Sequence, residues 1–371
     1  MRLRSLVLAL ALSLCVASCG GGAGSSSSSS SSSGPPPNAS PDQLATSAAH
    51  AFLSTYANSD GRVQRTDQGG DTVSEGQAYG LLAAVAVGDR KRFDQIWSWT
   101  QHNLQQPSGL FAFHWAGGKV VDAQPASDAD LDMARALLVA SCRFNEPNFK
   151  RAAVRIGNAV LAHETAKAGP LQVLLPGPWA NKGGYVVFNP SYLDPTTLQA
   201  LAKATGNARF SALATGGTQL VNDLTRPLPP DWAIVNTHTG QPTPVSAASS
   251  TSGPGMFSFD APRTLVRFGV DSDPAGRAAV ARAWSVFSQT APQDIVTQHQ
   301  LSGAPAGNSH SPVTLAAVAG AAKAAGDTSA VPGLLKQAQQ LNQQHPTYYG
   351  SAWVALGRLL LTTNRLAPCT G

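Results

Sequence analysis

The connections between the helical segments of this chain alternate between short and long, and this alternation constrains the fold more than any other feature. Apolar residues at 3.6-residue spacing predict about twelve helices. Tight turns such as 88–90 and 145–147 join some of them, whereas long connections rich in Gly, Pro and Trp precede the second, fourth, sixth, eighth and tenth. The predicted helices are 44–57, 75–87, 91–104, 128–143, 147–166, 195–204, 208–224, 261–270, 273–289, 311–326, 330–343 and 348–362.

A short turn makes the two helices that it joins antiparallel neighbours, so every second helix runs in the same direction. The long connections then lie at one end of the molecule, where the even-numbered helices begin. The helices over 75–87 and 311–326 are apolar nearly all round, which is typical of an inner layer, whereas those over 91–104 and 147–166 are amphipathic. Six inner and six outer helices predict an all-α fold, an (α/α)6 barrel, over residues 42–371.

The first 41 residues are predicted to lie outside this barrel. Residues 1–19 have the pattern of an export signal, with two arginines before a short apolar run. The last four, Val-Ala-Ser-Cys, resemble the lipobox of bacterial lipoproteins. We therefore expect a lipid on Cys19 that anchors an exported protein at the outer membrane, facing the periplasm; a plain secretory signal is the alternative. Residues 20–41, which contain nine consecutive serines, are expected to form a flexible tether.

The charge and the cysteines bear on the partners of the chain. The net charge of +5 is spread along the sequence without a run of Lys or Arg, so no nucleic-acid partner is predicted. No Cys/His cluster has the spacing of a zinc site, and no metal or other cofactor is predicted. Beyond residue 19, Cys142 and Cys369 remain either as one disulfide or as two free thiols.

Three acidic residues, Glu75, Asp128 and Asp260, each stand at the start of a predicted inner helix. The alternating connections place all three starts at one end of the barrel, so their carboxylates gather on one rim. Hydrolysis of a glycosidic bond requires such a group. One carboxyl gives a proton to the leaving oxygen, and another activates water or stabilises positive charge on the sugar.

The same acidic residues also fit a purely structural interpretation. Ser74 and Ser127 each fit a capping box with the polar residue three positions later, and Asp260 fits an N-cap. A helix N-terminus lowers the pKa of a carboxyl, whereas a general acid needs a raised pKa. Glu75 can therefore serve as an acid only if burial and neighbouring carboxylates outweigh the helix dipole.

Tryptophans in the long connections support a carbohydrate site. Trp115, Trp179 and Trp232 lie at the predicted active end, and flat indole faces pack well against the C–H faces of pyranose rings. Each of them alone is also compatible with ordinary packing. The tryptophans that fall within predicted helices are assigned to packing: Trp97, Trp99, Trp284 and Trp353.

Several blocks of this sequence resemble glycoside hydrolase family 8, in the order that the family has them. The likeness covers residues 44–362 and points to the endoglucanases associated with bacterial cellulose synthesis. The block Ala126 to Ala134 is similar to the most specific signature of the family. The other blocks are 74–82, 88–89, 93, 97–100, 189–193, 230–232, 259–263 and 348–349.

The resemblance implies an (α/α)6 barrel that cuts β-1,4-glucan within the chain and inverts the anomeric carbon. By position, Glu75 is then the general acid, Asp260 the general base, and Asp128 the residue that holds the distorted sugar. The implied substrate contacts are Arg263, Trp115 and Tyr192. The implied partners are a β-glucan polysaccharide and the machinery of cellulose synthesis or export.

The chain departs from the family pattern beside the predicted base. Phe259 stands where the family usually has Tyr, and Pro262 stands where it usually has an aliphatic residue. Loss of the hydroxyl weakens the hold on the water, which leaves open lower activity or another β-linked substrate such as xylan, chitosan or mixed-linkage glucan. A glycan-binding lipoprotein without activity is a further alternative. A polysaccharide lyase on the same barrel needs a basic cleft and a Tyr/His pair, which the long connections do not show clearly.

Overall fold

The structure is a computed structural model of the 371-residue chain, and it describes residues 38–368. These residues belong to one compact unit, Pro37–Gly371. The predicted export signal, the lipid site at Cys19, most of the predicted tether and Cys369 lie outside the described residues. No helix in the described part of the chain is both long enough and apolar enough to cross a membrane.

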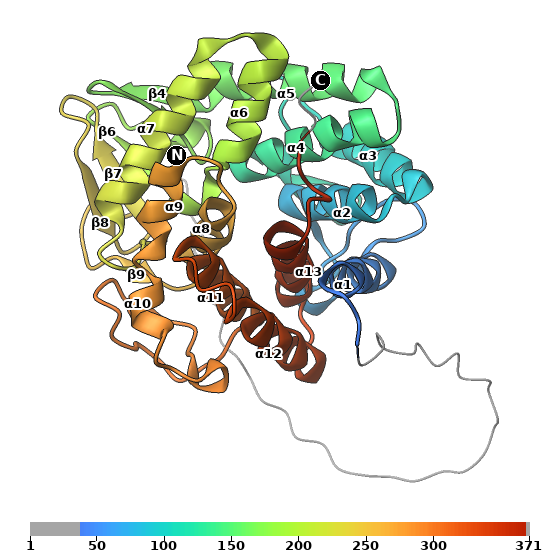
Figure 1. The fold of residues 1–371 in the computed structure, drawn as a ribbon. Helices are drawn as coiled ribbons and strands as arrows, with labels where there is room; N and C mark the ends of the chain where they lie inside the picture. Colours follow the sequence, from blue (N-terminus) through green and yellow to red (C-terminus); the bar gives the residue numbers. More distant parts are fainter. Residues whose placement is uncertain (1–37, 369–371) are drawn as a thin grey trace. The chain divides into compact units, whose positions relative to one another are not determined.

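Six helices form a closed inner ring, and each contacts the next (Figure 1). Their surfaces are mostly buried, and in α4 every residue from Ser127 to Ala140 is buried. Small residues let the backbones approach closely, since a methyl group on Gly269 would lie 2.6 Å from the carbonyl oxygen of Gly320. The ring consists of α2 (Ser74–Val87), α4 (Ser127–Arg143), α6 (Pro195–Thr205), α8 (Ala261–Gly269), α11 (Pro312–Ala324) and α13 (Tyr348–Thr362).

Outer helices pack around this ring through one apolar face each. In α3, for example, Phe93, Ile96, Trp97 and Leu104 are buried, whereas Arg90 and Lys91 in its first turn are exposed. The outer layer consists of α1 (Pro41–Tyr56), α3 (Arg90–Leu104), α5 (Pro147–His163), α7 (Ala208–Leu224), α9 (Pro274–Ala281), the short α10 (Trp284–Phe287) and α12 (Val331–Gln344). The predicted (α/α)6 barrel is confirmed.

Two predicted helices end early. The segment predicted as one helix over 273–289 is divided into α9 and α10, because the chain turns at Arg282 and Ala283. The helix predicted to reach residue 166 ends at His163, and Thr165–Ala168 forms strand β4 instead. In both places the apolar periodicity continues past the end of the helix.

The long connections contain short antiparallel strands, which the sequence analysis did not predict. They include β1, which ends directly before α2, β3, which ends two residues before α4 begins, and β9, which ends four residues before α8 begins. The strands pair as β1 (Thr72–Val73), β2 (Ala112–Ala116) and β3 (Lys119–Pro125); β4 (Thr165–Ala168) and β5 (Leu171–Leu174); β6 (Tyr185–Phe188), β7 (Trp232–Asn236) and β8 (Pro242–Val245); and β9 (Met256–Phe257) with β10 (His299–Gln300). Single 3-10 turns lie at Thr66–Gln68, Pro178–Ala180, Pro190–Tyr192 and Pro292–Asp294.

Cys142 lies in the last turn of α4, at the end opposite to the helix starts, and it is disulfide-bonded. The alternative of a free thiol is therefore wrong for Cys142. Since it is the one cysteine among the described residues, its partner lies outside them. The pairing with Cys369 stays a prediction.

Candidate active site

The caps expected at the three helix starts do not form, although Asp128 accepts from the backbone N–H of Ala129 in its own helix. The residues at the N-cap positions of α2 and α4 are Val73 and Ala126, which make no side-chain cap, and Asp260 makes none for α8. The hydroxyls of Ser74 and Ser127 are buried without a hydrogen-bond partner in the described part of the chain. The structural interpretation by local capping is therefore wrong at all three starts.

The residues expected to complete the two capping boxes bind elsewhere. The Gln77 carbonyl oxygen accepts from the backbone N–H of Val63 at 2.6 Å, and its amide donates to the hydroxyl of Thr100 at 2.8 Å. Oδ1 of Asp130 accepts from the backbone N–H of Phe111 at 3.2 Å. These bonds fix the long connections against the starts of α2 and α4, and leave the acidic residues free for another role.

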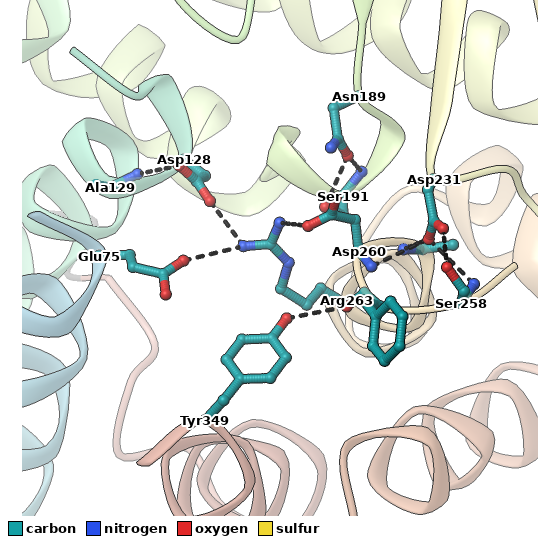
Figure 2. A network of polar contacts seen from close by, with 12 residues as sticks. Glu75, Asp128, Ala129, Asn189, Ser191, Asp231, Ser258, Asp260, Arg263 and Tyr349 are labelled. Atoms are coloured by element: carbon teal, nitrogen blue, oxygen red, sulfur yellow. Dashed lines mark hydrogen bonds and ion pairs between the residues drawn. The ribbon is translucent and has the colours of Figure 1, made fainter. Parts of the chain in front are cut away.

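One buried arginine, Arg263 in the first turn of α8, joins the three acids (Figure 2). Its Nη1 donates to Oδ2 of Asp128 at 2.7 Å, and its Nη2 donates to Oδ1 of Asp260 at 2.7 Å. The same Nη1 lies 3.6 Å from Oε2 of Glu75. Side chains from α2, α4 and α8 thus meet around a single guanidinium that is only 2% exposed.

This shared contact limits the separation of Glu75 and Asp260. Because Nη1 and Nη2 belong to one planar group, the contacting oxygens of the two carboxyls lie within about 9 Å of each other. Carboxyls roughly 6.5–9.5 Å apart leave room for a water molecule between one of them and the sugar. The upper limit of about 9 Å places the two acids on one rim and includes this range; it also includes the roughly 5–5.5 Å of a retaining hydrolase, so the limit by itself does not decide between the two mechanisms.

The environment of Glu75 favours its protonated form. Burial raises the pKa of its carboxyl to about 7; the positive charge of Arg263 opposes this shift, and the negative charge of Asp128 adds to it. Its side chain keeps 21% of its surface exposed, so a ligand can reach it. Burial and a neighbouring carboxylate thus outweigh the helix dipole, as a general acid at this position requires.

Asp260 and Asp128 differ in how firmly they are held. Burial also raises the pKa of Asp260, whereas its ion pair with Arg263 lowers it, and its side chain is 30% exposed. Asp128 is almost fully buried, and its two oxygens accept from Arg263 and from the backbone N–H of Ala129. Asp260 is therefore the more accessible carboxyl, and Asp128 the more rigid one.

Aromatic side chains extend the site beside Asp128. The Arg263 guanidinium lies 5.2 Å from the ring centre of Tyr192, and Trp232 packs against the same ring. Tyr192 and Trp179 line a cavity of about 370 Å³, which also reaches Phe113 and Ala126. Such an aromatic cavity is suited to the apolar faces of sugar rings.

Trp115 packs against side chains that do not belong to the charged cluster. On β2, its ring meets the indole of Trp99 edge-on at 5.4 Å and the guanidinium of Arg62 at 4.7 Å. No contact of Trp115 with Arg263 or the three acids is recorded among the described residues. Its role as a sugar contact stays a prediction.

Two further residues of this site, Asp231 and Tyr349, had no role predicted from the sequence. The hydroxyl of Tyr349 donates to the carbonyl oxygen of Phe259 at 3.2 Å, directly before Asp260. Asp231 accepts hydrogen bonds from the same segment. Both belong to blocks of the family resemblance, which was the available signal.

Within residues 38–368, no group of three or more His, Cys, Asp and Glu side chains could hold a metal ion.

Comparisons with known proteins agree on one family. The family model described as Glycosyl hydrolases family 8 matches residues 39–363. A probable endoglucanase of Novacetimonas hansenii is 38% identical over 240 residues, which cover 62% of this chain and 68% of that protein. The solved structure of endo-β-1,4-glucanase CMCax from Acetobacter xylinum is 31% identical, with a TM-score of 0.73 over 87% of this chain and 100% of that chain.

A more distant solved structure shares the fold alone. The β-1,3-1,4-glucanase from Paenibacillus sp. X4 is 21% identical, with a TM-score of 0.77 over 88% of this chain and 94% of that chain. The family match, in contrast, spans nearly the whole barrel and includes every acid around Arg263. This chain therefore belongs to glycosyl hydrolases family 8, as the resemblance of its sequence blocks predicted.

Proposed function

We propose that this protein is an inverting endo-β-1,4-glucanase, with Glu75 as the general acid and Asp260 as the general base. The observation that carries the proposal is the pair of accessible carboxyls on opposite sides of one buried guanidinium. The raised pKa of Glu75, about 7, supports the acid role, because the group still holds a proton in weakly acidic solution. The endoglucanases among its relatives support the choice of substrate.

The proposed reaction takes place in one displacement. Glu75 gives its proton to the glycosidic oxygen while the bond from that oxygen to the anomeric carbon breaks. Asp260 takes a proton from a water molecule, whose oxygen forms the new bond to the anomeric carbon from the opposite face. The turnover leaves Glu75 ionised and Asp260 protonated, and exchange with solvent restores both.

Arg263 and Asp128 have supporting roles in this proposal. Arg263 fixes the direction of the Asp260 carboxyl through the 2.7 Å hydrogen bond. Asp128 is held on both of its oxygens, so it presents a rigid acceptor to the hydroxyls of a distorted ring in the central subsite. Tyr192 and Trp179 would bind neighbouring sugars in the aromatic cavity.

The stereochemistry of the first product tests this proposal. The purified protein is incubated with a cello-oligosaccharide, and the anomeric signals are followed by NMR from the first seconds. Release of the α-anomer from the β-linked chain is expected. Early appearance of the β-anomer contradicts inversion and would make Asp128 a candidate nucleophile.

A substrate panel separates the proposal from its alternatives. Phe259 leaves the site without the hydroxyl that the family usually has before the base, and its side chain is 63% exposed. Reducing ends are therefore measured on carboxymethylcellulose, mixed-linkage glucan, xylan and chitosan. A clear preference for another polymer would make that polymer the assigned substrate. Binding without cleavage of any of the four polymers supports the glycan-binding alternative.

We also propose that Cys19 carries a lipid that anchors the protein at the outer membrane, facing the periplasm, and that the protein acts beside the machinery of cellulose synthesis or export. The lipobox-like residues support the first part, and the resemblance to endoglucanases of cellulose synthesis supports the second. Labelling with a fatty acid, compared between the wild type and Cys19→Ser, tests the lipid. The alternative to the lipid anchor is secretion without lipid. Co-purification with a cellulose synthase tests the proposed partner.

A further inference from the structure

The carboxylate of Asp231 is surrounded by the segment that carries the proposed base (Figure 2). Its Oδ1 accepts from the backbone N–H groups of Ser258 at 3.1 Å, Asp260 at 3.0 Å and Ala261 at 2.7 Å. Its Oδ2 accepts from the hydroxyl of Ser258. Asp231 is itself fixed, because its own N–H donates to the carbonyl of Met256 at 2.7 Å. Four donors from one short segment thus converge on one side chain.

Asp231 replaces the cap that α8 lacks. Helix N-termini leave N–H groups unpaired, and an acidic or hydroxyl side chain at the N-cap usually accepts from them. Asp273 does so for α9, where it accepts from the N–H of Ala275 at 2.9 Å. Asp260 occupies the N-cap position of α8, yet Asp231 takes the N–H groups there. The Asp260 carboxyl is thereby free to point at Arg263.

The segment is also held from its other side. The hydroxyl of Tyr349, on α13, donates to the carbonyl of Phe259. Asp231 therefore holds the N–H groups on either side of Phe259, and Tyr349 holds the carbonyl between them. A segment fixed at consecutive peptide groups cannot turn its side chains without breaking several hydrogen bonds.

We infer that Asp231 is the positioning residue of the base: it caps α8 from another part of the chain, and so fixes the direction in which Asp260 presents its carboxyl to the water. This inference rests on the proposed role of Asp260. Asp231 acts through the backbone of residues 258–261 and through its charge, and it does not touch the sugar in this assignment.

The charge of Asp231 has an effect separate from its hydrogen bonds. Burial is the main cause that raises the pKa of Asp260; Arg263 lowers this pKa, and the negative charge of Asp231 raises it. Removal of that charge should therefore lower the pKa of Asp260 and make it a weaker base. The other titratable groups that face this carboxyl are Glu75 on α2, Asp128 on α4, Tyr192 before α6, Arg263 on α8 and Tyr349 on α13.

Two variants separate the two effects. Asp231→Ala removes the hydrogen bonds and the charge, and a base displaced by about 1 Å can cost on the order of a hundredfold in kcat, with little change in KM. Asp231→Asn keeps an oxygen that can accept the same N–H groups. It should recover most of kcat while the acidic limb of the pH profile of kcat/KM moves to lower pH.

Asp273→Ala is the matched control, because it removes the cap of a neighbouring helix away from the acids. It should lower the melting temperature without altering kcat or the pH profile. The inference is overturned if Asp231→Ala behaves like Asp273→Ala, or if Asp231→Asn leaves the acidic limb in place.

Hydrogen exchange supplies a measurement that does not depend on activity. The amides of residues 258, 260 and 261 should lose protection in Asp231→Ala and keep most of it in Asp231→Asn. If the wild type cuts none of the glucans tested, the proposed function fails, yet exchange still shows whether Asp231 fixes this segment. Unchanged protection of these amides in Asp231→Ala contradicts the inference even when the enzyme is active.

Discussion

At the scale of single residues, the guanidinium of Arg263 holds the carboxyls of Glu75, Asp128 and Asp260 together and affects the pKa of Glu75 and of Asp260. Glu75, Asp128 and Asp260 could be predicted because each begins an apolar helix after a long connection. Asp231 was given no role in the site, because its partners are backbone N–H groups that lie 27 to 30 residues further along the chain. Its place in the block 230–232 of the family resemblance was the one signal in the sequence. Whether the acids cap their helices also needed the structure, since capping depends on side-chain direction.

Removal of the proton donor should nearly abolish cleavage. Glu75→Gln keeps the shape of the side chain but has no proton to give, so kcat on β-1,4-glucan should fall by roughly a hundred- to ten-thousandfold. Binding of a cello-oligosaccharide, measured by calorimetry, should stay close to that of the wild type. Glu146→Gln is the control, since Glu146 caps α5 on the surface and should leave kcat unchanged. A fully active Glu75→Gln variant would remove Glu75 from the mechanism.

The pH profile should report the environment of Glu75. The acid must be protonated to act, and its pKa is raised to about 7, so kcat/KM should be lost as the pH rises through about 7. Asp260 must be ionised, and its raised pKa should limit activity on the acidic side. The charge of Arg65 lowers the pKa of Glu75, so Arg65→Gln should move the alkaline limb to higher pH. Initial rates across the pH range measure both limbs; an alkaline limb unmoved by Arg65→Gln counts against this assignment.

At the scale of elements, long apolar segments were predictable and short strands were not. Most predicted helices begin and end within three residues of the observed ones, because a buried helix repeats its pattern over several turns. Most strands of the long connections have two to five residues, too few to show alternation. The seven-residue β3 shows none, because all of its residues except Pro125 are exposed. The break between α9 and α10 was missed because the residues around Arg282 keep the composition of a helix.

Close packing of α8 against α11 makes a prediction at this scale. A methyl group on Gly320 would collide with the backbone carbonyl of Leu265, so Gly320→Ala should destabilise the fold by about 1–3 kcal/mol. Gly333→Ala, in the outer helix α12, has open space around the added methyl and should be neutral or stabilising, by up to about 1 kcal/mol. Denaturant unfolding of both variants tests the pair; equal stability of the two would contradict the close approach of the inner helices.

At the scale of the whole molecule, contacts between distant parts of the chain complete the barrel. α13 packs against α1 and α2, and Arg135 of α4 donates to the carbonyl of Leu366 beyond the last helix. The alternation of connections predicted this arrangement, because it depends only on helix direction and number. The sequence left the state of Cys142 open, since the pairing of two cysteines depends on distances that no local pattern contains.

Peptide mapping should identify the partner of Cys142. Digestion without reduction is expected to yield one peptide pair that joins Cys142 to Cys369, and reduction should separate it. Cys369→Ser should then leave Cys142 open to a thiol reagent after unfolding. If Cys142 still forms a disulfide within the chain in this variant, its partner is a cysteine other than Cys369.

With Glu75 protonated, the carboxylates of Asp128 and Asp260 share one guanidinium at this rim of the barrel, and the excess of negative charge should make the enzyme sensitive to the charge of its polymer. A glucan with anionic substituents near the bond to be cut meets repulsion, whereas a neutral glucan does not. Hydroxyethylcellulose should therefore be cut faster than carboxymethylcellulose of equal substitution, and added salt should narrow the difference because it screens charge. Viscometry of the two polymers at low and high salt measures this. Equal rates at low salt would mean that charged groups reach the barrel only where they do not face the acids.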